Sequence, residues 1–77
     1  MNQELKQKLI ESGYKGEFGL SELIEACGDR FVSLDKVEDP KGWSCSYEDL
    51  EGGIEDVGCF NTPEEAVANL WLELNKK

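Results

Sequence analysis

Hydrophobic residues near the start of the chain recur at three and four positions, which is the spacing of an amphipathic helix. Leu5, Leu9 and Ile10 fall on one face at this spacing. Asn2 is a suitable N-cap, and the Ser-Gly pair at residues 12–13 favours an end to the helix. We therefore predict a short first helix with a narrow apolar stripe.

A second short helix is predicted to begin at Ser21 and to end at Gly28, because serine favours the N-cap and glycine the C-cap. Its apolar face consists of Leu20, Leu23, Ile24 and Cys27. The glycine-containing connector before it carries two aromatic residues, Tyr14 and Phe18, which we expect to anchor the connector to the core.

The pattern changes from a helical to a strand-like period at Phe31. Residues 31–37 predict a first strand and residues 39–42 (Asp-Pro-Lys-Gly) a turn. A second strand follows, in which Trp43, Cys45 and Tyr47 alternate with small or polar residues. Residues 54–60 predict a third strand in antiparallel order, although the glycine at position 58 weakens its regularity.

The end of the chain predicts a longer helix. Thr62 is suited to the N-cap, Pro63 to the first helical position and Glu65 to the third, where it can complete a capping box. Four residues at helical spacing form its apolar face: Val67, Leu70, Trp71 and Leu74. Asn75 is the predicted exit, and Lys76 and Lys77 complement the negative end of the helix dipole.

These elements predict an α+β fold in the order α-β-β-β-α, with one or two short helices before the sheet. With 77 residues, the chain is long enough for one compact domain, residues 1–77, and too short for two. We expect the C-terminal helix to cover one face of a three-stranded antiparallel sheet, because its broad apolar face needs a partner.

Charge narrows the choice of partner. Seventeen Asp and Glu residues against eight Lys and Arg residues make the net charge −9, which repels nucleic-acid phosphates. A basic protein is therefore the expected partner, and direct nucleic-acid binding is disfavoured. No apolar run is long enough to span a bilayer and the first ten residues are not signal-like, so we expect no membrane association and a location in the cytoplasm of a host cell.

The acidic residues concentrate around the two predicted turns. We predict a partner-binding surface that also includes Trp43 and consists of Asp35, Glu38, Asp39, Glu48, Asp49, Glu51, Glu55 and Asp56. Such a row of carboxylates can imitate phosphates and occupy a basic groove of another protein. The alternative is a solvated sheet edge whose charges only prevent aggregation. For the aromatic residues, core packing is the alternative to a contact role.

The composition offers little for catalysis. The chain has no histidine, which removes the commonest general base, and we predict no enzyme activity, no catalytic residue and no cofactor. Three cysteines without metal-binding spacing predict no metal site and indicate reduced thiols, each among apolar neighbours and expected to be buried: Cys27, Cys45 and Cys59. An enzyme using carboxylates or the Cys59 thiol is the less favoured alternative.

Two stretches carry a family resemblance. Residues 62–71 (TPEEAVANLW) and 23–31 (LIEACGDRF) resemble small uncharacterised phage and prophage proteins, which implies an origin and no activity. Residues 31–74 are more weakly similar to HicB-like antitoxin domains, a resemblance that implies binding to a partner toxin. The predicted element order is also similar to that of double-stranded RNA-binding domains, whose basic contact residues have no counterpart here.

Taken together, the pattern favours a small acidic phage-type protein that binds a host or partner protein through its acidic surface. One form of this hypothesis is an inhibitor of a nucleic-acid-handling complex. The alternative hypothesis is an antitoxin-like or structural module that associates with itself, so the expected state is a monomer or a homodimer.

Overall fold

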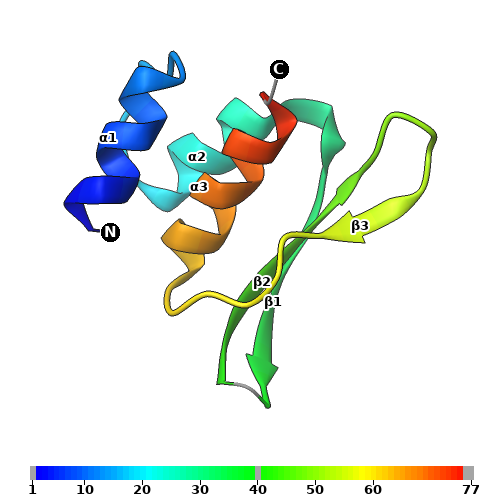
Figure 1. Ribbon diagram of the computed structural model, residues 1–77. Helices are drawn as coiled ribbons and strands as arrows, with labels where there is room; N and C mark the ends of the chain where they lie inside the picture. Colours follow the sequence, from blue (N-terminus) through cyan, green and yellow to red (C-terminus); the bar gives the residue numbers. More distant parts are fainter. Residues whose placement is uncertain (1, 40, 76–77) are drawn as a thin grey trace.

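A computed structural model of the protein describes residues 2–39 and 41–75. Three helices and a three-stranded antiparallel sheet follow one another in the predicted order (Figure 1). The elements are α1 (Gln3–Glu11), α2 (Leu20–Cys27), a short 3-10 turn η1 (Gly28–Arg30), β1 (Phe31–Glu38), β2 (Lys41–Glu48), β3 (Ile54–Asp56) and α3 (Pro63–Leu74). The α+β class and the packing of the C-terminal helix on the sheet are confirmed.

Local chemistry determines where α1 and α3 begin. The Asn2 side chain accepts a hydrogen bond from the Leu5 backbone N–H at 2.8 Å, and Thr62 Oγ1 accepts one from the Glu65 N–H at 3.1 Å. Each bond satisfies an amide that has no partner within its helix, so both predicted N-caps are confirmed. The Glu65 carboxylate also accepts a bond from the Thr62 hydroxyl at 3.3 Å.

The start predicted for α2 is wrong by two residues. Gly19, in an extended conformation, is the N-cap, and its carbonyl accepts a hydrogen bond from the Leu23 N–H at 3.0 Å. Ser21 therefore lies inside the helix, where its side chain is exposed. The predicted end at Gly28 is confirmed.

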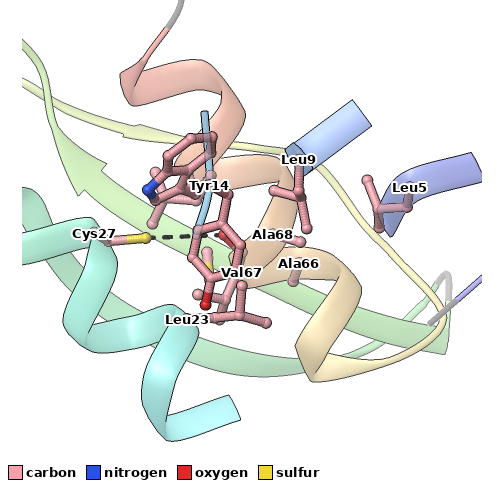
Figure 2. Close-up of a cluster of buried hydrophobic side chains, with 11 residues drawn as sticks. Leu5, Leu9, Tyr14, Leu23, Cys27, Ala66, Val67 and Ala68 are labelled. Atoms are coloured by element: carbon pink, nitrogen blue, oxygen red, sulfur yellow. Dashed lines mark hydrogen bonds between the residues drawn. The ribbon is translucent and has the colours of Figure 1, made fainter. Parts of the chain in front are cut away.

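Helix α3 lies between the sheet and the two N-terminal helices (Figure 1). Because both sides of α3 are covered, its buried residues are not confined to one face of the helix. They are Ala66, Val67, Ala68, Leu70 and Trp71. The two alanines leave little side chain between α3 and its neighbours, which allows a close approach. Figure 2 shows Leu5 and Leu9 of α1, and Leu23 of α2, pointing toward α3.

The core is apolar among the residues that the structure describes, with no buried polar or charged residue. Leu9, Leu23 and Leu70 are fully buried, and each contributes about 1.5–3 kcal/mol through loss of water contact. Tyr14 closes the cluster: its ring lies 5.3 Å from that of Trp71 in an edge-on arrangement, and its hydroxyl donates to the Glu17 carbonyl. Ile10, which was predicted on the apolar face of the first helix, is instead 54% exposed.

Strands β1 and β2 form the predicted hairpin, in which Leu34 lies opposite Cys45 and Glu38 opposite Lys41. The turn is shorter than predicted, because Lys41 and Gly42 already belong to β2; Pro40 lies outside the described residues. Lys76 and Lys77, predicted to complement the dipole of α3, also lie outside them.

The third strand is shorter than the predicted 54–60 and ends at Asp56. Ser46 lies opposite Asp56, and Trp43 lies opposite Phe60. The returning chain from Asp56 to Phe60 is therefore one residue longer than the segment of β2 with which it pairs. The extra residue is a bulge, and Gly58 accommodates it at a φ of 96°. This turn of the chain also leaves Cys59 exposed, against the prediction that it is buried.

Candidate functional site

The predicted acidic surface is divided among three places on the sheet. One group lies at the end of β2, in the turn that follows and in β3: Glu48, Asp49, Glu51 and Glu55. A second lies at the tip of the β1–β2 hairpin: Glu38 and Asp39. Asp35 and Asp56 lie between them along the strands. Figure 1 shows the hairpin tip and the β2–β3 turn at opposite ends of the sheet, so these residues do not form one continuous row.

The group at the β2–β3 turn includes a carboxylate that is hydrogen-bonded to the backbone of the turn. Asp49 Oδ1 accepts hydrogen bonds from the backbone N–H groups of Glu51 and Gly53, both at 2.8 Å. The Asp49 N–H donates to the Gly53 carbonyl, also at 2.8 Å. One carboxylate thus organises the whole turn, as Asx turns do. We call residues 48–55 the acidic turn.

Leu50 is the apolar residue at the tip of the acidic turn, and 91% of it is exposed. Ile54, at the start of β3, is 60% exposed. A leucine held in water on an ordered turn gains nothing for the fold, whereas it can contribute to binding when a partner covers it. Carboxylates stand on both sides of Leu50 in the sequence, at Asp49 and Glu51, so this apolar side chain has negatively charged neighbours.

A shallow depression lies between the acidic turn and the end of α3. Seven residues line it: Arg30, Tyr47, Asp49, Leu50, Glu51, Glu73 and Leu74. Arg30 is held in place, since its Nε donates to the Glu48 carbonyl at 2.8 Å and its guanidinium lies 6.0 Å from the centre of the Tyr47 ring. The lining of the depression therefore combines two leucines, a phenol and three carboxylates with one hydrogen-bonded cation.

The electrostatic character of this end of the sheet is negative. Burial, together with the charges of Glu73 and Glu55, raises the pKa of Tyr47, while Arg30 lowers it and Asp49 raises it. The phenol therefore stays protonated at neutral pH and is available as a hydrogen-bond donor. The arrangement suits recognition by charge, apolar contact and hydrogen bonding.

At the other places the acidic side chains have local partners or basic neighbours. Asp35 accepts a hydrogen bond from the Ser33 hydroxyl at 2.9 Å. Asp56 Oδ1 accepts one from the Gly58 N–H at 3.2 Å and thereby supports the bulge. Glu38 lies opposite Lys41, which offsets part of the charge at the hairpin tip.

Trp43 lies on the helix side of the sheet and is half-buried against the core. Its backbone exchanges two hydrogen bonds with Phe60, at 2.7 and 2.8 Å, which tie the bulged segment to β2. Trp71 is buried and packs against Tyr14, as predicted for a core aromatic. Trp43 lies near the hairpin end of β2, whereas the acidic turn begins at the other end of that strand, at Glu48.

The cysteines differ in their surroundings. Burial raises the pKa of the Cys27 thiol from 9.0 to about 11 and that of Cys45 from 9.0 to about 12. The Cys27 thiol points at the Val67 carbonyl, 3.9 Å away (Figure 2). Both thiols thus stay protonated and unreactive at neutral pH. Among the described residues no group of three or more potential ligands could hold a metal ion.

Five of the residues that line the depression were not predicted as site residues: Arg30, Tyr47, Leu50, Glu73 and Leu74. Leu50 interrupts a polar, glycine-containing turn without following a strand or helix period, and that interruption is a signal in the sequence. Glu73 offered no such signal, because only the packing of α3 brings it to the depression beside Tyr47.

The length and apolarity of the helices bear on the membrane prediction. In the part of the chain that the structure describes, no helix is both long and apolar enough to cross a membrane. Comparisons with protein families, with curated proteins and with solved structures found no match to this chain.

Proposed function

We propose that this protein binds a basic protein partner through its acidic turn, with Leu50 as the apolar anchor. The observation that carries the proposal is the 91% exposure of Leu50 on a turn whose backbone N–H groups at Glu51 and Gly53 both donate to the Asp49 side chain. Because the turn is already ordered, binding costs little conformational entropy. A net charge of −9 speeds the encounter with a positively charged surface.

The partner class that suits this surface is a protein with a basic, phosphate-binding groove. Glu48, Glu51 and Glu55 are exposed at one end of the sheet, and a groove built for phosphates carries the opposite charge. Inhibition of a nucleic-acid-handling complex by occupation of such a groove follows as the proposed activity. The resemblance of residues 62–71 to small phage proteins is part of the same proposal and concerns origin alone.

The test is affinity capture from cell lysate with the protein and two matched variants. Leu50→Ser removes the anchor, whereas Val32→Ser removes an apolar side chain that is 47% exposed outside the acidic turn. We expect Leu50→Ser to lower the affinity for the captured partner about tenfold or more, as loss of a hot-spot residue does, and Val32→Ser to leave it unchanged.

Salt provides the second part of the test. The complex is expected to weaken as the salt concentration rises, because screening reduces attraction between exposed charges. A complex that keeps its affinity at high salt, or that is equally affected by the two serine variants, contradicts the proposal. Circular dichroism of both variants controls for folding.

A further inference from the structure

The directions of the backbone groups in β2 can be read from its bonds to the returning chain. Trp43 exchanges bonds with Phe60, and the Cys45 carbonyl accepts one from the Val57 N–H at 3.0 Å. The backbone hydrogen-bonding groups of Trp43 and Cys45 in β2 therefore point toward β3 and the chain that follows it. Since successive residues of an antiparallel strand point to opposite sides, Ser44 between them points toward β1.

The same alternation applies to β1. Asp35 lies opposite Ser44 and bonds inward. Leu34 and Lys36, on either side of Asp35, direct their N–H and C=O groups away from the sheet. In residues 2–39 and 41–75 no further strand pairs with β1 on that side. The ladder shifts only between Phe31 and Ser33, so residues 33–38 form a regular edge, which is a template for another strand.

The side chains along this edge disfavour a second copy of the chain. In a twofold antiparallel pairing of two β1 edges, residues whose N–H and C=O groups point outward must lie opposite each other. The pairing that involves most of residues 33–38 is therefore centred on Asp35 or on Lys36. It then places two carboxylates, or two ammonium groups, directly opposite each other, which is destabilising. The net charge of −9 on each copy adds long-range repulsion.

We propose that the β1 edge binds an extended segment of a partner protein by antiparallel strand addition, with basic residues opposite Asp35 and Glu38. Apolar residues of the segment lie opposite Leu34 and Val37, both of which are partly exposed. Read from its N-terminus, the segment has the pattern basic, apolar, polar, basic, apolar. This inference rests on the proposed function for the charge of the partner, and it uses a different surface.

The experiment is an NMR titration of the ¹⁵N-labelled protein with a capped peptide that contains Lys-Val-Thr-Lys-Val. The backbone amides of Leu34 and Lys36 are expected to shift and to exchange more slowly with water. Lys36→Pro removes an amide that points outward, so the β1–β2 ladder survives. We expect this variant to bind the peptide at least about fivefold more weakly, and Lys36→Ala, which keeps the amide, to bind like the wild type.

Peptide variants make the test independent of the folding of Lys36→Pro. Methylation of the threonine nitrogen, opposite Lys36, blocks a bond to β1 and should abolish binding. Methylation of the lysine nitrogen opposite Asp35 affects an amide that points away, and binding should persist. Equal effects of the two methyl groups, or unchanged binding by a folded Lys36→Pro variant, overturn the proposal.

Two further outcomes separate this inference from the proposed function. A peptide with glutamate in place of both lysines should bind at least about tenfold more weakly, because it meets Asp35 and Glu38 with like charge. Equal binding of the two peptides contradicts the charge requirement of the inference, while the Leu50 experiment still tests the proposed function separately. Sedimentation that reveals a dimer lost in Lys36→Pro overturns the inference in favour of a second copy.

Discussion

The two faces of the sheet differ in what lies against them. On the helix side, Cys45 is fully buried beneath α3, whereas on the opposite side Ile54 keeps 60% of its surface in water. Burial of apolar surface therefore stabilises the helix side of the sheet, whereas the opposite side remains in contact with water. The difference teaches that the apolar contacts that stabilise this small protein lie on the helix side of its sheet, and that the opposite side contributes little to them.

The largest expected effect comes from truncating one apolar residue on each side of the sheet, which tests whether the two sides contribute differently to stability. Leu70 of α3 is fully buried in the core, so Leu70→Ala leaves a cavity there. This substitution is expected to lower the free energy of unfolding by about 2–5 kcal/mol. Ile54→Ala, on the open face, is expected to change it by about 0.5 kcal/mol or less. Urea denaturation measures both, and similar losses would show that the open face is also covered.

A smaller effect is expected where the returning chain crosses β2. A Cβ atom at Gly42 would lie 2.5 Å from the Phe60 carbonyl oxygen and 2.6 Å from Cys59 Sγ. Because one of these contacts is with backbone, Gly42→Ala is expected to destabilise the protein by about 1–3 kcal/mol. Ser44→Ala, two residues along the same strand, is the control and should have little effect in the same urea titration.

Loss of a helix cap should cost less again. Thr62→Ala removes the acceptor of the Glu65 N–H at the start of α3, and the expected loss in the free energy of unfolding is about 1 kcal/mol. Thr62→Ser keeps the hydroxyl and should recover most of it. Thermal denaturation of the two variants compares them, and an equal loss in both would mean that the methyl group of Thr62, not its hydroxyl, stabilises the helix.

An effect that is absent at neutral pH concerns the buried thiol of Cys45, whose pKa is raised from 9.0 to about 12, chiefly by burial. Below pH 9 the folded and unfolded states both hold the proton, so the contribution of this thiol to stability is constant. As the pH rises toward 12, the unfolded state releases its proton first and unfolding becomes easier.

The stability of the wild type should therefore fall more steeply above pH 9 than that of Cys45→Ala, because the other titrating groups are common to both proteins. Urea denaturation at a series of alkaline pH values measures the difference. Parallel curves for the two proteins would contradict the raised pKa. At neutral pH, a thiol reagent should label the exposed Cys59 before it labels Cys45.

Elements with local chemical signals were the most predictable. The Asn2 and Thr62 caps and the alternation along β2 led to elements that the structure confirms. The predictions for Ser21 and Cys59 were wrong, because a backbone cap at Gly19 and a bulge at Gly58 compete with the side-chain signals. The acidic residues were identifiable by composition, but their division among three places was not, since it depends on where each turn ends.

The sequence by itself determined the order of helices and strands, the apolar character of the core and the excess of negative charge, because propensity, capping and hydrophobic period act over a few neighbouring residues. The tertiary structure alone decided that α3 lies between two layers, that Glu73 faces the acidic turn, and that Leu34 and Lys36 direct their amides outward. These features depend on contacts between residues distant in the chain, and no local pattern encodes them.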